Sequence, residues 1–440
     1  MTIPLNIQQM MANGRYQAYT YAYPHKTAYR PLTPPQPLAP LWAQENQDNL
    51  FLYLHIPFCE MRCGFCNLFT TANPQTDTVT RYLHTLRHQA QQLRHILPHG
   101  RIAQVAIGGG TPTYLTPAEL DTLFTIIVDI WNVDPTHTPI AIEASPATAT
   151  PDRLARLRDF RISRLSLGLE SAIPAELRAL GRPERLAAMT AAWPHLHHAD
   201  FPSLNIDLIY GIPGQTPTSW RQSLQLLVDH QVDEIYLYPL YVRPLTGLGR
   251  QGTIADNRFQ LYQIGRDFLL DNGYHQQTMR HFQRHPTTNA TTTYHCQEDG
   301  MIGLGCGARS YTRTLHYATD YAVSRPNVRA ILHDWLNRPT TSWTQADYGF
   351  HLNQDEQKRR YLLKSLLHHT GLHTTHYQAY FGTHPLTDFP QLNDLVTTDL
   401  ATATPTHYTL TPTGLAWSDA IGPWLYSPTI NHLSQTFTLT

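Results

Sequence analysis

Cysteine is scarce in this sequence, and long apolar runs are missing. Only five cysteines occur in 440 residues, and three of them are crowded into one short segment, which does not indicate a disulfide framework. The most apolar stretches, such as Phe124–Trp131, are far shorter than a membrane-spanning helix requires. The first residues show neither the basic segment nor the apolar core of a secretory signal. These absences predict a cytoplasmic protein with no membrane span.

An excess of charge of either sign is also lacking. Lys plus Arg total 32 and Asp plus Glu total 33, so the formal net charge is -1. Such a balance gives no field that favours a nucleic-acid backbone, and we expect no nucleic-acid partner. The 25 histidines include His195, His197 and His198 and the pair His368 and His369. Their spacing is not the i, i+4 spacing of ligands on one helix face, and we interpret them as surface composition.

Strand and helix patterns alternate over residues 49–275. The apolar, β-branched runs are Phe51–Ile56, Ile102–Ile107, Ile140–Ala144, Ser163–Leu169, Leu204–Tyr210 and Glu234–Val242. Helical patterns cover 78–97, 116–131, 151–159, 173–193, 216–229 and 256–271. This alternation predicts parallel strands joined by right-handed crossovers. Six units are too few for a closed eight-unit barrel, so we predict an α/β fold with a partial (β/α)6 barrel.

Three of the predicted helices begin with Thr followed by Pro: Thr116-Pro117, Thr150-Pro151 and Thr216-Pro217. A threonine side chain can cap a helix, and proline suits the first helical position. Glu119 follows Thr116 by three residues and completes a predicted capping box.

Three further regions flank the barrel. Residues 1–48, rich in Pro, Tyr and Gln, are predicted to form an extended arm on the main domain. Residues 276–339 are predicted to extend the barrel and contain the glycine-rich segment Gly303–Ser310. Residues 340–440, with a helical pattern at 355–369, are predicted to form a small α+β module of winged-helix-like shape. Such a shape does not by itself indicate DNA binding.

Cys59, Cys63 and Cys66 follow the first predicted strand with the spacing C-x-x-x-C-x-x-C. Three thiolates on one short loop can each bind one iron of a cubane and leave the fourth iron without a protein ligand, open to substrate. The alternative is a zinc site or buried thiols, but zinc prefers four ligands in paired spacings. Cys296 and Cys306 lie in another region, and we expect them to be small buried side chains.

Glycine or polar residues stand at the end of every predicted strand. In a parallel β/α fold, chemistry collects at the carboxyl ends of the strands. These ends carry, in order, the cysteine loop, Gly108–Thr113, Glu143, Glu170, Asp207 and Tyr241. Bare glycine backbone lets a ligand approach closely, and carboxylates can hold ribose hydroxyls or an ammonium group, which suits S-adenosylmethionine. Alternatively, the glycines form only a tight turn, Glu143 caps the next turn, and Arg182 pairs with Asp207 or Glu170.

The run Tyr53–Cys59, followed by Cys63 and Cys66, resembles the radical S-adenosylmethionine (SAM) superfamily. More narrowly, it resembles the oxygen-independent coproporphyrinogen III oxidase-like branch. Three further segments match that branch, and the resemblance extends from about residue 48 to 435: Gly108–Thr113, Asn205–Gly211 and Gly303–Ser310.

The resemblance implies a [4Fe–4S] cluster on Cys59, Cys63 and Cys66 that binds SAM and cleaves it reductively to a 5′-deoxyadenosyl radical. It also implies an electron donor such as flavodoxin or ferredoxin and a small-molecule substrate, for which a tetrapyrrole is one candidate. By position, the family's SAM contacts are Tyr53, Phe65, Gly109, Gly110, Thr111, Glu143, Glu170, Arg182, Asp207, Tyr241 and Arg309. Glu143 and Asp207 are expected to take part in catalysis. Glu170 stands where the family has Gln, and Tyr241 where it has a small residue.

Activities within the branch differ, and one position separates this chain from the true oxidases. Those enzymes resemble C-x-x-x-C-x-x-C-x-C, whereas Leu68 occupies the last position here. The leading hypothesis is an enzyme that uses the adenosyl radical on an organic substrate. The alternatives are a haem-binding or haem-delivering protein without turnover and an electron-transfer iron–sulfur protein. A methylase would require a second SAM beside the first.

Overall fold

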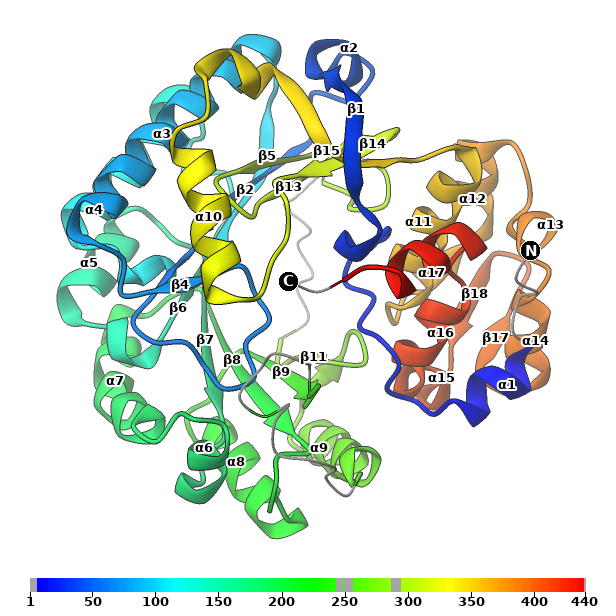
Figure 1. Ribbon diagram of the computed structural model, residues 1–440. Coiled ribbons are helices and arrows are strands. Elements are labelled where there is room, and N and C mark those ends of the chain that lie inside the picture. Colours follow the sequence, from blue (N-terminus) through cyan, green and yellow to red (C-terminus); the bar gives the residue numbers. More distant parts are fainter. Residues whose placement is uncertain (1–5, 243–247, 249–255, 286–293, 439–440) are drawn as a thin grey trace.

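The computed structural model describes residues 6–242, 248, 256–285 and 294–438. Six parallel strands form the centre of a curved sheet: β2 Leu50–Ile56, β5 Ile102–Gly109, β6 Ile140–Ala144, β7 Arg164–Glu170, β8 Ser203–Tyr210 and β9 Glu234–Pro239. Helices cover its outer face: α3 Thr76–Ile96, α4 Pro117–Thr125, α5 Pro151–Asp159, α6 Pro174–Ala179, α7 Arg185–Ala199, α8 Pro217–Asp229 and α9 Arg258–Asp271 (Figure 1). The predicted partial (β/α)6 barrel is confirmed.

Antiparallel strands extend the sheet at both edges. They are β1 Arg30–Pro37, β13 Arg309–Tyr311, β14 Leu315–Ala318, β15 Gln345–His351, β10 His275–Gln276 and β11 His281–Gln283, while β12 Met301–Leu304 runs parallel to β2. The sheet then has 13 strands in the order β1-β15-β14-β13-β12-β2-β5-β6-β7-β8-β9-β11-β10. The glycine-rich segment Gly303–Ser310 therefore lies beside the first barrel strand.

Side-chain alternation decides which residues face inward. In β2, Leu50, Leu52 and Leu54 are fully buried against the helices. Phe51 and Tyr53 between them keep some exposure on the inner face. The same alternation in β6 and β8 turns Glu143 and Asp207 inward while their apolar neighbours join the core. The strand pattern therefore brings the predicted rim residues to one inner face.

The predicted helix at 173–193 is wrong in two respects. It is split into α6 and α7, because Gly181 adopts φ +72° and is followed by Arg182 and Pro183. In addition, α7 continues through Pro194 to Ala199 instead of ending before the proline. The break lifts Arg182 out of a helix and toward the cysteine loop.

All three predicted helices begin at the predicted Thr-Pro pairs, but the threonine side chain caps the helix at only two of them. Thr116 and Thr216 each form a capping box, the first with Glu119 as predicted. Thr150 occupies the N-cap position of α5, but its hydroxyl donates to the Asp152 carboxylate at 2.5 Å and does not cap a backbone N–H. An acidic residue two positions on therefore competes with the backbone for the threonine.

The C-terminal region has its own sheet and core. Strands β16 Leu372–His373, β18 His407–Leu410 and β17 Ala401–Ala403 form a three-stranded antiparallel sheet. It packs with helices α11 Gln354–Leu366, α12 Thr374–Phe381, α14 Leu392–Thr397, α15 Pro412–Ala416, α16 Ser418–Trp424 and α17 Pro428–Gln435. This confirms the predicted α+β module, while the boundaries of the four-part division of the chain remain a proposal.

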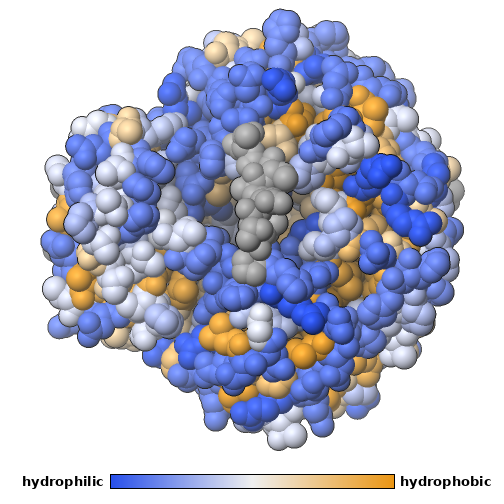
Figure 2. All heavy atoms as spheres, turned by 180° about the vertical axis from the view of Figure 1, so that it is seen from behind, coloured by the Kyte–Doolittle hydropathy of each residue, from blue (hydrophilic) through white to orange (hydrophobic). Residues whose placement is uncertain are grey.

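The N-terminal arm connects this module to the barrel. Helix α1, Ile7–Ala12, places Ile7 and Met10 in the core of the C-terminal module, and Tyr23 joins the same core. The arm then passes between the two bodies and enters the main sheet as β1 (Figure 1). Seen from behind, hydrophilic residues cover most of the surface, and apolar residues form small separate groups (Figure 2).

Candidate functional site

The cysteine loop is closed at its base by a short parallel pair of strands. Strand β3, Phe58–Cys59, pairs with β4, Thr71–Ala72, so the chain between them forms a loop directly beyond β2. Cys59, Cys63 and Cys66 on this loop are free thiols and half-buried. The structure thus brings the three predicted ligands to one short, partly accessible loop.

The glycine-rich end of β5 fixes the start of this loop through its backbone. The Gly110 N–H donates to Ile56 O and the Thr111 N–H to Phe58 O, both at 2.8 Å. A Cβ at position 110 would lie 2.6 Å from Phe58 O and 2.9 Å from Cys59 Sγ. Because a side chain would meet rigid backbone there, only glycine permits this approach.

The α6–α7 break holds the other side of the loop. The Gly64 N–H donates to Leu180 O at 3.2 Å, and the Arg182 guanidinium donates to the Cys63 sulfur. Arg182 therefore pairs with a cysteine, and neither partner considered from the sequence, Asp207 or Glu170, receives its hydrogen bond. The contact with the Cys66 thiol and burial raise the pKa of Cys63, and the Arg182 charge opposes this rise.

His55 lies beneath the loop between two glycines. A Cβ added to Gly109 would lie 2.5 Å from His55 Cε1, and a Cβ added to Gly307 would lie 3.1 Å from His55 Nε2. The ring is hydrogen-bonded to Tyr53 Oη at 3.1 Å and to Phe69 O at 3.0 Å. Burial lowers the pKa of His55 to about 4, so the imidazole is neutral at physiological pH.

The sequence pattern does not mark His55 as a residue of the site. Its strand position alone looks like that of any core residue, and only the surrounding glycines reveal how closely it is held. As a neutral ring bonded to Tyr53, it orients that hydroxyl on the inner face.

Glu143 presents a fixed but accessible carboxylate to the inner face. It accepts a hydrogen bond from the Gly109 N–H at 3.0 Å, and a Cβ on Gly108 would lie 2.9 Å from its carboxyl carbon. The side chain remains solvent-accessible, although protein atoms surround it and burial raises its pKa. The interpretation of Glu143 as a turn cap does not hold, because its bond crosses to another strand.

Asp207 lies on the same inner face and is held by a neighbouring amide. Asn205 Nδ2 donates to Asp207 Oδ1 at 2.7 Å and to Ser166 Oγ at 2.7 Å. Burial raises the pKa of Asp207 to about 7, and the nearby Glu143 and Glu170 charges contribute to the rise. Asp207 can therefore exist in either protonation state near neutral pH.

Glu170 is engaged by a residue that the sequence did not suggest. Arg185 Nε and Nη2 donate to its two carboxylate oxygens at 2.9 and 3.3 Å, and both side chains are 8% exposed. Glu170 has φ +64°, and a register shift in the pairing of β7 with β8 accompanies it. Burial would raise the pKa of Glu170, but Arg185 and Arg182 outweigh it and hold the pKa below its usual value.

Three other predicted contacts lie around this core of the site. Phe65 packs on a small apolar cluster that includes Leu180 and Ile209. Arg309 Nη1 donates to Tyr21 Oη of the arm at 3.0 Å. Tyr241 lies just beyond β9 and donates to Asp419 Oδ2 of the C-terminal module at 2.5 Å, so its hydroxyl is engaged there.

Comparison with known proteins identifies the family. The profile described as "Radical SAM superfamily" matches residues 53–227, which include the cysteine loop, Glu143 and Asp207. Residues 53–227 thus carry a radical SAM domain.

Curated relatives of this radical SAM chain carry different names. It is 32% identical over 269 residues to the mouse mitochondrial "Radical S-adenosyl methionine domain-containing protein 1", covering 58% of this chain and 59% of that relative. It is 26% identical over 400 residues to the oxygen-independent coproporphyrinogen III oxidase of Salmonella typhimurium, covering 84% of both. It is 26% identical to the heme chaperone HemW of Bacillus subtilis, covering 60% of this chain and 72% of that relative.

Among solved structures, coproporphyrinogen III oxidase (HemN) from Escherichia coli superposes with a TM-score of 0.77 at 22% identity, covering 94% of this chain and 98% of that chain. This likeness shows a shared fold. The sequence relatives support the resemblance to the coproporphyrinogen oxidase-like branch.

Radical SAM proteins bind a [4Fe–4S] cluster and SAM, and the cysteine loop fits the cluster. It offers three soft thiolate donors, one of them beside the Arg182 cation. Among the described residues, no three histidine, cysteine or acidic side chains converge to hold a single metal ion. This is compatible with a cubane, which takes one thiolate at each of three separate iron corners.

The inner face fits SAM in the same way. Glycine backbone at 109 and 110, the accessible Glu143 carboxylate and the Tyr53 hydroxyl lie next to the cysteine loop. The glycines permit close approach of a ligand, and the carboxylate and hydroxyl offer polar partners to an amino-acid nucleoside.

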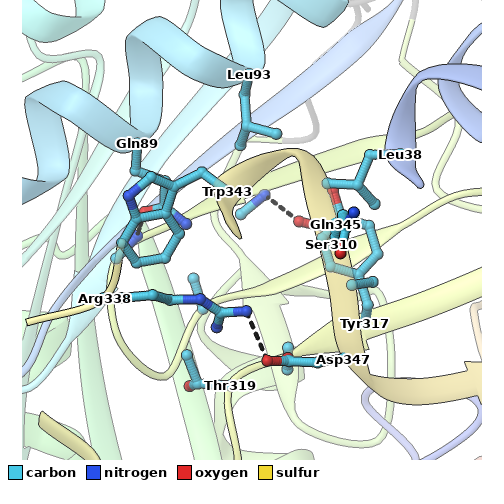
Figure 3. Close-up of a pocket in the computed structure, with 15 residues that line it drawn as sticks. Leu38, Gln89, Leu93, Ser310, Tyr317, Thr319, Arg338, Trp343, Gln345 and Asp347 are labelled. Atoms are coloured by element: carbon cyan, nitrogen blue, oxygen red, sulfur yellow. Dashed lines mark hydrogen bonds and ion pairs between the residues drawn. The ribbon is translucent and has the colours of Figure 1, made fainter. Parts of the chain in front are cut away.

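A small cavity elsewhere does not contribute to this site. It holds about 40 Å³ between α3 and strands β12–β15, on the helix-covered side of the sheet (Figure 3). The ion pair between Arg338 and Asp347 at 2.6 Å lines it, with Trp343 beside the guanidinium. The cavity is too small for a cofactor.

None of the helices in the described part of the chain is long and apolar enough to span a membrane.

Proposed function

We propose that this chain is an enzyme that cleaves SAM reductively and directs the resulting radical at a small organic substrate that carries carboxylates. When bound, the cluster supplies the electron that breaks the sulfonium bond of SAM, giving methionine and a 5′-deoxyadenosyl radical. The observation that carries the proposal is the Glu143 carboxylate, accessible beside the cysteine loop and fixed by the Gly109 N–H at 3.0 Å. A protein that only transferred electrons would not need a fixed carboxylate that can accept hydrogen bonds from a bound ligand.

Each residue of the site has a proposed task. Cys59, Cys63 and Cys66 hold the cluster. The backbone of Gly109, Gly110 and Thr111, together with Glu143 and Tyr53, receives the polar groups of SAM, with Phe65, Glu170, Arg182 and Asp207 completing the surroundings. Asp207 is suited to hold or release a proton near neutral pH because its pKa is raised to about 7.

Arg309 supports an anionic substrate. In the part of the chain that the structure describes, its guanidinium forms no ion pair with a carboxylate and is surrounded by tyrosines, with Tyr21 as a hydrogen-bond partner. A guanidinium on the inner face, among aromatic rings, matches an organic acid by charge and geometry. A tetrapyrrole with carboxylate side chains has this chemistry. Arg309 is thus proposed to contact substrate, in addition to its family match to a SAM contact.

A haem-binding chaperone without turnover is the second candidate. It is favoured by the match to the heme chaperone HemW. Leu68, which stands where true oxidases have a further cysteine, departs from the usual form of both the oxidases and the chaperones. Both candidates keep the cluster, so they differ only in whether SAM is consumed.

The distinguishing experiment is anaerobic. The cluster is reconstituted and reduced with dithionite, SAM is added, and 5′-deoxyadenosine is quantified by chromatography. We expect product from the wild type and none from Cys63→Ala. A fully loaded cluster that binds SAM but yields no product, together with stoichiometric haem binding, would transfer the assignment to the chaperone.

The cellular setting is also part of the proposal. All five cysteines are free thiols, which supports a reducing compartment such as the cytoplasm. Reduction of the cluster there requires a protein electron donor, with flavodoxin or ferredoxin as the expected class.

A further inference from the structure

The hydrogen bonds of His55 fix the direction of the bond that Tyr53 makes. One ring nitrogen of His55 lies 3.0 Å from Phe69 O, and the other lies 3.1 Å from Tyr53 Oη. A backbone carbonyl can only accept, so the nitrogen beside Phe69 must carry a hydrogen. The same holds if the ring is turned over, since one nitrogen still faces the carbonyl and the other the hydroxyl.

The second nitrogen of the ring accepts, because a neutral imidazole has only one N–H. Burial lowers the pKa of His55 to about 4, which keeps the ring neutral at physiological pH. The Tyr53 hydroxyl must then donate its hydrogen to His55. The lone pairs of that hydroxyl can only accept, and no other hydrogen bond engages them in the described part of the chain.

The imidazole has little freedom to change this arrangement. His55 is 5% exposed, and its backbone carbonyl accepts from Tyr82 Oη at 2.6 Å. Gly109 and Gly307 approach the ring so closely that neither position leaves ordinary space for a Cβ. The direction of the Tyr53 hydroxyl is therefore set before any ligand binds.

Glu143 offers a second acceptor near the Tyr53 hydroxyl. Burial raises the pKa of Tyr53, the Glu143 charge adds to that rise, and a smaller effect of Arg309 opposes it. The Arg309 guanidinium itself donates to Tyr21 Oη at 3.0 Å. A carboxylate and an acceptor-only hydroxyl together suit a cationic group with several N–H donors, such as an ammonium.

We infer that His55 is a positioning residue that makes Tyr53 an acceptor for the ammonium group of SAM. The inference rests on the proposed function, in which SAM binds beside the cysteine loop. His55 touches no ligand in this arrangement and acts only through the Tyr53 hydroxyl. The pair thereby recognises the amino-acid end of SAM.

The test compares two ligands, SAM and the analogue of SAM that lacks the α-amino group. Both are titrated anaerobically into cluster-loaded protein without a reductant, so that SAM is not cleaved, and calorimetry gives the two dissociation constants. Their ratio isolates the contribution of the ammonium. Tyr53→Phe is expected to lower this preference for SAM about 10-fold, because a hydrogen bond to a charged group is lost.

His55 is tested through the same ratio. His55→Leu is expected to lower the preference about 4-fold, since the Tyr53 hydroxyl remains but its hydrogen can turn towards the ammonium. His55→Gln, whose amide oxygen can accept from Tyr53, is expected to stay close to the wild type. In the Tyr53→Phe background, His55→Leu should cause no further loss of preference.

A matched control removes a hydroxyl from another tyrosine of the inner face. Tyr236 is half-buried in β9, and its ring stacks on that of His281. Tyr236→Phe is expected to leave the preference for SAM unchanged. The iron content of each variant is measured beside the titration, so that all proteins are compared at equal loading.

Equal losses of affinity for both ligands in His55→Leu would show a merely structural role and overturn the inference. A Tyr53→Phe protein with the wild-type preference would also overturn it, whether or not His55→Leu takes up the cluster. Failure of the cluster-loaded wild type to bind SAM at all would instead refute the proposed function.

Discussion

Arg280 and Asp419 form an ion pair across the junction of barrel and C-terminal module, and their side chains are only 3% and 1% exposed. Arg280 lies before β11 and Asp419 in α16. The same carboxylate accepts the Tyr241 hydroxyl, and the Asp419 carbonyl accepts the N–H of Ala18 in the arm at 3.0 Å. Barrel, arm and module therefore meet at one residue.

Breaking this pair is expected to destabilise the protein strongly. Asp419→Ala leaves the Arg280 charge buried without its partner, which should lower the free energy of unfolding by about 3–5 kcal/mol. Urea unfolding measures this. The matched control is Asp267→Ala, whose partner Arg266 forms a pair in which Asp267 is 57% exposed, and about 0.5 kcal/mol is expected there. Equal effects of the two variants would contradict the role of the buried junction.

Gly109→Ala is expected to destabilise the site far more than a glycine change at another position of positive φ. Its Cβ would lie 2.5 Å from the His55 ring, and Gly109 has φ +117°. Gly273→Ala is the control, because Gly273 has φ +82° with no atom within 4 Å of the added carbon. We expect about 1 kcal/mol for Gly273→Ala and about 3 kcal/mol for Gly109→Ala, measured by thermal unfolding. Iron content after reconstitution should fall only in Gly109→Ala.

The raised pKa of Asp207 predicts that the stability of the protein decreases as the pH rises. Its pKa is raised from 3.8 to about 7, so the folded protein binds its proton more tightly than the unfolded chain does. The resulting stability is complete below about pH 4 and is lost as the pH rises to about 7. Asp207→Asn should remove this dependence, which partial solvent access limits to about 1–3 kcal/mol. Urea unfolding at pH 5 and pH 8 checks it; identical pH profiles of wild type and variant would refute it.

Replacing Glu170 by the glutamine that the family usually has there is expected to destabilise this protein. Glu170→Gln removes the charge that neutralises buried Arg185 and should lower the free energy of unfolding by about 2–4 kcal/mol. Adding Arg185→Met should recover most of that loss, since the unpaired cation is then gone. The free energies of unfolding in denaturant of the wild type, both single variants and the double variant form a double-mutant cycle. Additive losses would show that the pair is not coupled.

The barrel strands and the inward residues could be predicted because strand periodicity reports side-chain direction directly. Each of the six predicted runs overlaps an observed barrel strand, and the inward positions of Glu143 and Asp207 follow from it. The cysteine spacing is equally local. What these residues bind remains a proposal.

Partners across the fold could not be predicted. Arg185 and Arg182 lie only three residues apart, and their sequence neighbours do not show which one reaches Glu170. The helix break at Gly181, which the predicted helix at 173–193 ignored, decides that Arg182 reaches Cys63 while Arg185 stays in α7. The link from Tyr241 to Asp419 joins residues 178 positions apart and depends on module docking, which no local pattern contains.

The path of the arm has a consequence for synthesis on the ribosome. Ile7, Met10 and Tyr23 emerge before the barrel, but the core that receives them is built from residues of the C-terminal module, which emerge after it. Strand β1 likewise awaits β15. The arm must therefore remain without its final partners until the C-terminal module has been made, while the barrel between them can already fold.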